Sequence, residues 1–217
     1  MGRTAFFIIC LFTTVIIEEM KKFTVLLAAA VGLLLGGCQS SSQKNETAAE
    51  ETNDSVKTTL VAYFSASEVR ATERVARTLA EAADADLFEI VPEMAYTTED
   101  LDWKDEQSRS TVEMKDSTAR PAVASKVENM DQYTTIYVGF PIWWYTAPRI
   151  INTFLEQYNL EGKTIIPFAT SGGSDMGKSG EDLKNASAPK ANWILPGKVL
   201  NGNPPVDSLK VWIETLK

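Results

Sequence analysis

Histidine is absent from this chain of 217 residues. The chain therefore has no imidazole for acid–base catalysis, for a Ser–His–Asp triad or for metal binding. Both cysteines, Cys10 and Cys38, lie in the N-terminal fifth, so the remainder can form no disulfide, zinc finger or Cys-ligated iron–sulfur cluster. We predict no metal site and single out no catalytic side chain. Enzymatic chemistry would need carboxylates, hydroxyls, lysines or, more readily, an organic cofactor.

Positive charge is also scarce, because 21 Lys and Arg residues stand against 29 Asp and Glu residues, which leaves a net charge of −8. Proteins that bind nucleic acid carry a basic surface that neutralises phosphates. The acidic balance therefore argues against a nucleic-acid partner.

The N-terminal region has the pattern of an export signal. Residues 20–38 read MKKFTVLLAAAVGLLLGGC, with two lysines, an apolar run shorter than the ~20 residues of a membrane-spanning helix, and small residues before Cys38. The LGGC ending resembles a bacterial lipobox, which implies that Cys38 is lipidated and begins the mature protein. The alternative is a plain signal peptide or membrane anchor with an incidental cysteine. We expect a protein anchored by lipid alone to the bacterial cell membrane, outside the cytoplasm.

Three further segments complete the organisation of the chain. Residues 1–19 place Glu18 and Glu19 where a signal needs positive charge, so we interpret them as an upstream extension and Met20 as the true start. Residues 39–56 are polar and lack aromatic side chains, which predicts a flexible tether. Residues 57–217 have the usual size of one domain and hold all five Trp and all nine Pro residues.

Strand and helix patterns alternate through this domain. Apolar strand patterns occur at 58–65, 85–92, 134–141, 163–171 and 192–201. Helices are predicted at 72–83, 147–158, 177–187 and 204–217, and a mostly exposed helix is expected within 95–118. Strands that are apolar on both faces require helices on both sides of a parallel sheet. We therefore predict an α/β fold with a doubly wound, five-stranded parallel sheet in a three-layer αβα arrangement.

Ligands in such folds bind outside the carboxyl ends of the strands. After the first strand, Ser65, Ser67 and Thr72 adjoin a helix whose free N–H groups suit a phosphate, although such residues also serve as ordinary caps. After the third strand, GFPIWWYTAPR places three aromatic side chains in a row, which cannot all face one core. They would stack on a planar ligand or pack in a core or an interface. The small residues of 170–174 let a ligand approach the backbone after the fourth strand.

Together these three loops resemble those of the flavodoxin-like, FMN-binding proteins, and most of all the secreted or lipoprotein-type members. The resemblance covers roughly residues 58–217 and rests on LVAYFSAS, GFPIWWYTAPRIINTFLE and PFATSGGSDMGKS. It implies a flavodoxin-like fold and a non-covalently bound FMN. Carried over, the phosphate ligands are Ser65, Ser67 and Thr72. The ring is bordered by Pro141, Ile142, Trp143, Trp144 and Tyr145, with Trp144 favoured for stacking, and closed on its other side by Thr170, Ser171, Gly172 and Gly173.

The function implied by this resemblance is electron transfer by a lipoprotein, to a redox partner protein or to a small acceptor such as a quinone. Acidic residues around the ring would lower its reduction potential and steer it to a basic partner. One alternative is an FMN-dependent reductase that acts on a quinone with NAD(P)H. Another is a binding protein of the same fold that has lost FMN, because EVRA separates Ser67 from Thr72 where the family usually has Gly and a Thr-x-Thr-like run.

The stretch GGSDMGKS at 172–179 also matches the P-loop pattern of nucleotide triphosphate binding. An NTPase further needs an Asp at another strand end to hold Mg²⁺, and neither IYVGF nor NWILPGKVL ends in one. We therefore interpret Lys178 as a surface lysine at the start of a helix.

Overall fold

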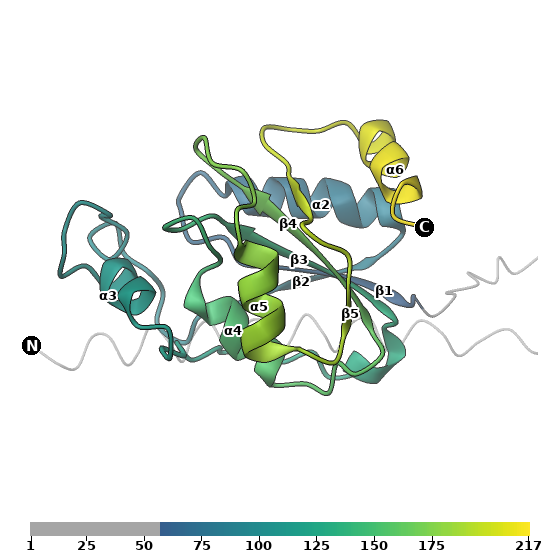
Figure 1. Ribbon diagram of the computed structural model, residues 1–217. Coiled ribbons are helices and arrows are strands. Elements are labelled where there is room, and N and C mark those ends of the chain that lie inside the picture. The colour runs from purple at the N-terminus through teal and green to yellow at the C-terminus, as the bar shows by residue number, and fades with distance from the viewer. Residues whose placement is uncertain (1–56) are drawn as a thin grey trace, which may run out of the picture. The chain divides into compact units, whose positions relative to one another are not determined.

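The computed structural model describes residues 57–217, which form a parallel sheet with helices on both faces (Figure 1). The predicted upstream extension at 1–19, the signal peptide with Cys38 at 20–38 and the tether at 39–56 lie outside the described residues. Within 57–217, every helix is too short or too polar to cross a bilayer.

The predicted strand regions form one parallel sheet. The strands are β1 (Thr59–Tyr63), β2 (Asp86–Glu89), β3 (Thr135–Pro141), β4 (Thr164–Thr170), β5 (Asn192–Trp193) and β6 (Lys198–Val199). Their order is β2-β1-β3-β4-β5, and β6 also pairs with β4. The chain therefore winds to one side through β2 and to the other through β3 and β4, which confirms the doubly wound sheet. The switch point lies between β1 and β3.

The strand predicted at 192–201 is divided into two short pieces. Pro196 has no N–H to donate to the sheet, and Gly197 has a φ of +88°. A Cβ on Gly197 would lie 2.2 Å from the carbonyl oxygen of Pro167, so only glycine allows this approach of the two backbones. β5 and β6 consequently pair with β4 on either side of the interruption.

Four amphipathic helices cover the sheet. They are α2 (Ala71–Ala83) and α6 (Val206–Glu214) on one face and α4 (Arg149–Glu156) and α5 (Ser179–Ser187) on the other (Figure 1). The prediction of three layers is confirmed. α4 begins two residues later than predicted, because Pro148 takes the N-cap position in front of its first turn.

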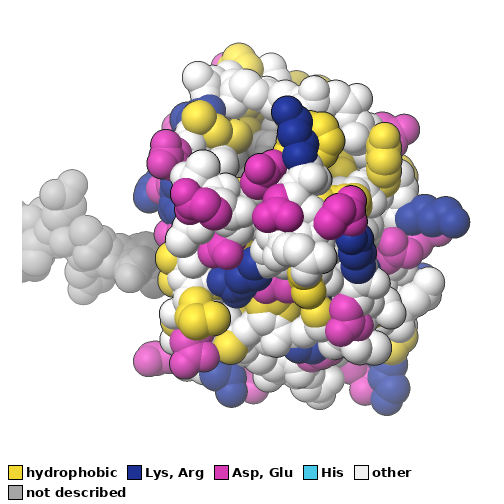
Figure 2. All heavy atoms as spheres, turned by 90° about the vertical axis from the view of Figure 1, so that its left-hand side faces the viewer, with side chains coloured by type: hydrophobic (Ala, Val, Ile, Leu, Met, Phe, Trp, Pro, Cys, Tyr) yellow, Lys and Arg dark blue, Asp and Glu magenta, His cyan; other side chains and the backbone are white. Residues whose placement is uncertain are grey.

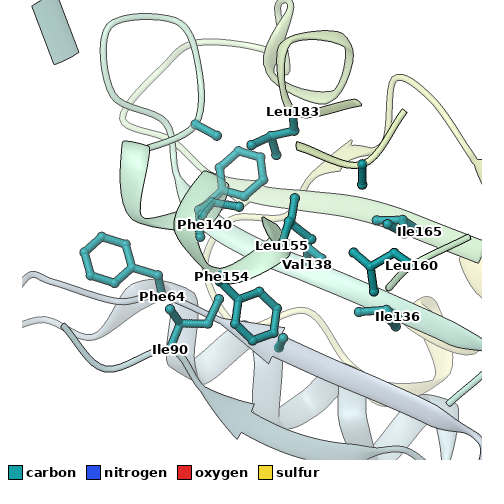
Figure 3. Close-up of a cluster of buried hydrophobic side chains, with 14 of the residues drawn as sticks. Phe64, Ile90, Ile136, Val138, Phe140, Phe154, Leu155, Leu160, Ile165 and Leu183 are labelled. Carbon is teal, nitrogen blue, oxygen red and sulfur yellow. The ribbon is translucent and has the colours of Figure 1, made fainter. Parts of the chain in front are cut away.

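The core lies between the sheet and these helices. Figure 3 shows the larger cluster, in which Phe140 and Val138 of β3 meet Phe154 and Leu155 of α4. Tyr137 faces the opposite side of β3 and joins the second cluster with Trp212 of α6. β3 is therefore buried on both faces, which explains its continuous apolar sequence.

The expectation of a mostly exposed helix within 95–118 is wrong for most of that segment. Only α3 (Arg109–Lys115) is helical. Before it, the side chains of Asp102 and Asp105 accept hydrogen bonds from backbone N–H groups two residues later, at 3.0 and 2.9 Å. Such local bonds compete with helix formation. Thr97 and Asp100 do form the predicted reciprocal capping pair, at 3.0 and 3.1 Å, but it closes a turn.

Candidate functional site

A cavity of about 580 Å³ opens at the carboxyl end of the sheet. This volume lies within the usual range for sites that bind small molecules and cofactors. The wall of the cavity comprises Ser65, Ala66, Ser67, Ala71, Thr72, Leu101, Trp103, Ser110, Pro141, Ile142, Trp143, Trp144, Tyr145, Thr170 and Ser174. The topology thus brings together the ends of β1, β3 and β4 with the start of α3 (Arg109–Lys115) and the segment that precedes it.

Nine of the twelve predicted cofactor-binding residues lie in this wall. They are Ser65, Ser67, Thr72, Pro141, Ile142, Trp143, Trp144, Tyr145 and Thr170. The other three, Ser171, Gly172 and Gly173, lie outside the wall. Ser174 is the residue of the same loop that lines the cavity. The role of each residue as a ligand stays a prediction.

The β1–α2 loop presents an uncapped helix end to the cavity. The N-cap residue of α2 is Arg70, which has a φ of 48° and makes no capping hydrogen bond with its side chain. The N–H groups of the first helical residues have no intrahelical acceptor, and two of these residues, Ala71 and Thr72, line the cavity. The hydroxyls of this loop therefore do not serve as N-caps of α2. The backbone N–H groups at the start of the helix can donate hydrogen bonds to a bound anion.

The side chain of Arg70 fixes this loop through hydrogen bonds and ion pairs. Its guanidinium donates to the carbonyl of Ser65 at 3.0 Å and to the carboxylates of Glu73 and Glu89, each at 2.5 Å. Hydrogen bonds from Arg70, and then from Arg77, hold the pKa of the Glu73 carboxyl below its ordinary 4.5. Arg70 is thus neutralised by carboxylates and lies outside the cavity wall, as does the exposed Glu68.

The β3–α4 loop is a two-residue hairpin that separates the three aromatic side chains. Trp143 and Thr146 exchange two backbone hydrogen bonds of 3.0 Å, and the central residues Trp144 and Tyr145 have φ values of 46° and 63°. This is the geometry of a type I′ turn, which normally selects Asn and Gly. Trp143 packs edge-on against Phe64, with ring centres 5.7 Å apart. Trp144 and Tyr145 project outward at the rim and are 41% and 76% exposed.

The β4–α5 loop uses its own side chains to bind its backbone. The Oγ of Ser171 accepts hydrogen bonds from the N–H groups of Gly173 and Ser174, at 3.1 and 2.7 Å. The Asp175 carboxylate accepts from the N–H of Gly177 at 3.0 Å. A P-loop would direct such N–H groups at phosphates. Lys178 is exposed and lies outside the cavity wall, so the structure gives no support to an NTPase site.

The segment before α3 is rich in acidic residues. Figure 2 views the molecule from the side on which α3 lies in Figure 1, and shows Asp and Glu side chains interspersed with Lys, Arg and exposed apolar ones. The segment before α3 alone contributes Glu99, Asp100, Asp102, Asp105 and Glu106. A cation or a basic surface would therefore be attracted to this side.

Three residues of the wall come from residues 96–115, the segment that ends in α3, which carries none of the predicted site residues. They are Leu101, Trp103 and Ser110. Trp103 is 69% exposed within a polar stretch. A large aromatic side chain within a polar stretch is the one feature of the sequence that could have indicated that this segment lies at the site.

The chemistry of the wall is divided. An uncapped helix end with the hydroxyls of Ser65 and Ser67 suits a phosphate monoester. The apolar and aromatic side chains, among them Ile142 and Trp144, suit a planar ring. Within residues 57–217, no group of three or more carboxylates, thiols or imidazoles is arranged to hold a metal ion.

Comparisons with known proteins find flavodoxins and flavoproteins. The sequence profile described as flavodoxin matches residues 58–216. A crystal structure of a Bacteroides uniformis protein, provisionally described as a flavoprotein, is 51% identical, with a TM-score of 0.67 over 72% of this chain and 97% of that one. A similar structure from Bacteroides eggerthii, also described provisionally, is 47% identical, with a TM-score of 0.68 over 73% of this chain and 96% of that one.

A more distant structure shows the same fold. It is a flavoprotein from Lactobacillus acidophilus in complex with FMN, which is 23% identical and has a TM-score of 0.51 over 66% of this chain and 92% of that one. No curated protein sequence matches this chain.

Proposed function

This chain belongs to the flavodoxin family, and we propose that it binds FMN in the cavity at the carboxyl end of the sheet and transfers electrons through it. The observation that carries the proposal is the division of one cavity into a phosphate-binding part and an aromatic part. FMN has both features, since it joins a planar ring to a phosphate monoester. Bound FMN supplies the redox chemistry, and the protein supplies binding, orientation and electrostatics.

In this proposal the phosphate lies at the start of α2. Ala71 and Thr72, whose N–H groups have no intrahelical acceptor, line that part of the wall together with Ser65 and Ser67. The positive end of the helix dipole favours the dianion. Glu68 is exposed outside the wall, so its charge is screened by solvent.

The ring lies against the hairpin after β3. Trp143 packs against Phe64 and Tyr96, with ring centres 5.7 and 5.5 Å away, and lines the cavity beside the more exposed Trp144 and Tyr145, which are free to contact a ligand. The acidic residues of the segment before α3 would disfavour added negative charge on the ring and so lower its reduction potential. The same charges would steer a basic redox partner to the open side of the cofactor.

A titration of the purified protein with FMN tests the proposal. We expect saturable binding at one site, seen as a change in the absorbance bands and a loss of the fluorescence of the flavin. Calorimetry on the same samples gives the stoichiometry. A protein that binds no FMN would refute the proposal and leave the alternative of a binding protein that has lost the cofactor.

A reductase that acts on a small acceptor is the second candidate. The observation that favours it is the exposure of Tyr145, which lines the cavity and is nevertheless 76% exposed. An open rim of this kind admits a small planar molecule such as a quinone. Turnover of NAD(P)H with a quinone by the FMN-loaded protein would support the reductase, whereas reduction that needs a partner protein would support the carrier.

We also propose that the domain is held at the outer side of the bacterial cell membrane by lipid on Cys38, through the tether at 39–56. The support is the lipobox-like sequence alone. Mass spectrometry of the mature protein should find a lipidated Cys38 as the first residue. Cys38→Ser should release the protein from the membrane fraction or leave the signal uncleaved, and an unmodified N-terminus elsewhere would contradict the proposal.

A further inference from the structure

We propose that residues 96–115, the segment that ends in α3, form a fourth wall of the FMN site, and that Trp103 and Ser110 contact the bound cofactor. This inference rests on the proposed function, and it adds residues that the three predicted loops do not contain. Trp103 and Ser110 both line the cavity, together with Leu101 from the same segment.

The segment is fixed to the other loops by an aromatic cluster. The ring of Tyr96 packs edge-on against Phe64 and Trp143, with centres 5.7 and 5.5 Å apart. Phe64 directly follows β1 and Trp143 begins the hairpin after β3, so Tyr96 joins the segment to two of the three predicted FMN loops.

Arg109 of α3 contacts this aromatic cluster. Its guanidinium lies 3.9 Å from the centre of the Tyr96 ring and donates to the Glu113 carboxylate at 2.7 Å. The hydroxyl of Tyr96 donates to the same carboxylate at 2.5 Å. Burial, followed by the hydrogen bond to Glu113, raises the pKa of the Tyr96 hydroxyl. The start of α3, where Ser110 lies, is thereby held beside the cavity.

Trp103 is suited to stack on a planar ligand. Its indole lines the cavity but remains 69% exposed. Leaving so large an apolar surface in water is unfavourable, and stacking on a flat ring would recover the loss. The turn that carries Trp103 is closed by the bond from the N–H of Asp105 to the carbonyl of Asp102, at 3.1 Å.

Ser110 supplies a polar group that lacks a partner. It is 1% exposed, and its Oγ makes no hydrogen bond with any residue of the described domain. Its backbone N–H is bound to the carbonyl of Asp100 at 3.0 Å, which fixes its position in the wall. Buried hydroxyls are nearly always hydrogen-bonded. A polar group of the cofactor, reached by a small adjustment of the side chains, would satisfy this one.

The test compares FMN affinities of the full-length protein and three variants by fluorescence titration. Trp103→Ala should weaken binding by about tenfold or more, by analogy with aromatic stacking on nucleic-acid bases. Val112→Ala is the matched control, because Val112 belongs to the same segment, is 50% exposed and lies outside the wall. This variant should bind FMN as the wild type does.

Ser110→Ala separates a ligand contact from a structural role. Removing a buried hydroxyl without a partner should leave the thermal stability of the FMN-free protein unchanged or higher. The same change should weaken FMN binding by about three- to tenfold if the hydroxyl bonds to the cofactor.

The outcomes distinguish the two proposals. A wild-type protein that binds no FMN refutes the proposed function and this inference with it. Wild-type binding that is equally strong in Trp103→Ala and Ser110→Ala overturns the fourth wall alone. A loss of affinity in both variants, with Val112→Ala unaffected, supports it.

Discussion

The side-chain oxygens of Thr72 and Thr170 lie 2.8 Å apart and form a buried hydrogen bond across 98 residues of sequence. Thr72 lies in the first turn of α2 and Thr170 ends β4. Their bond joins the loop proposed to hold the phosphate to the strand end proposed to lie beside the ring. The two parts of the site are thus joined by one buried hydrogen bond, and a substitution of either threonine should alter the environment of the other.

A double-mutant cycle should detect this bond. Thr72→Val and Thr170→Val each leave the other hydroxyl buried without this partner, so each should lower the free energy of unfolding by about 1–3 kcal/mol. The double variant should lose less than the sum, by about 1 kcal/mol. Denaturant unfolding measures all four proteins. Thr72→Val combined with Thr164→Val, at the opposite end of β4, is the control and should be additive.

The hairpin after β3 should trade stability for binding. Trp144 and Tyr145 adopt φ values of 46° and 63° that cost about 1–2 kcal/mol for residues other than glycine. Replacing them with the residues that a type I′ turn prefers, as Trp144→Asn with Tyr145→Gly, should raise the free energy of unfolding by about 1 kcal/mol. FMN binding should weaken by about 1–3 kcal/mol, because the exposed rings are lost. Calorimetry and thermal unfolding of the same samples measure both quantities.

Trp143→Ala should lower the free energy of unfolding, in contrast to the hairpin variant. Its ring packs edge-on against Phe64 and Tyr96, so truncation leaves a gap in the core cluster and should destabilise the fold by about 2–4 kcal/mol. If Trp143→Ala left stability unchanged while the hairpin variant unfolded more easily, the division between core and ligand-facing aromatic residues would be wrong.

Ser67 and Lys178 separate the FMN site from the P-loop interpretation. Ser67→Ala removes a hydrogen bond to a charged phosphate and should weaken FMN binding by about 1.5–3 kcal/mol. Lys178→Ala should change it by less than about 1 kcal/mol, since the lysine is exposed and outside the cavity wall. Calorimetry with ATP should show no binding to the wild type. Micromolar affinity for ATP that disappears in Lys178→Ala would overturn the assignment.

The ion pair between Glu73 and Arg70 should make stability depend on acid pH. Since folding lowers the pKa of Glu73 below 4.5, the contribution of the pair is complete above this value. It is lost as the pH falls through the lower pKa of the folded protein, where the carboxylate takes up a proton. Wild type should exceed Glu73→Gln in stability by up to about 1 kcal/mol at pH 7, and the difference should disappear in acid. A difference that persists at pH 2 would contradict the role of this charge.

Much of the fold could be predicted because it depends on local patterns. The apolar run at 134–141 requires burial on both faces of a strand, and β3 has it. The spacing of Val75, Ala76 and Leu79 requires one buried side of a helix, and α2 has it. The segment 95–118 was predicted less well, because competition between turns closed by Asp102 and Asp105 and a helix depends on small energy differences.

The candidate site was predictable where it lies on strand ends. Parallel strands bring their carboxyl ends to one edge, so Ser65, Pro141 and Thr170 had to lie near one another once the sheet was recognised. The sequence could not show that Ser171 binds its own loop through the N–H groups of Gly173 and Ser174. Side-chain hydrogen bonds of this kind depend on the final path of the loop.

The sequence by itself determined the alternation of strands and helices and the three loops that carry the resemblance, because each is encoded by neighbouring residues, and it is also the whole basis of the predicted export signal. Tertiary structure alone decided that Trp143 packs against the core while Trp144 and Tyr145 are exposed at the rim of the cavity, since the turn at Trp144 and Tyr145 sets their directions. It also placed Trp103 and Ser110 beside the site. Their position follows from the contact of Tyr96 with Phe64 and Trp143, and a contact between distant segments forms only when the whole chain has packed.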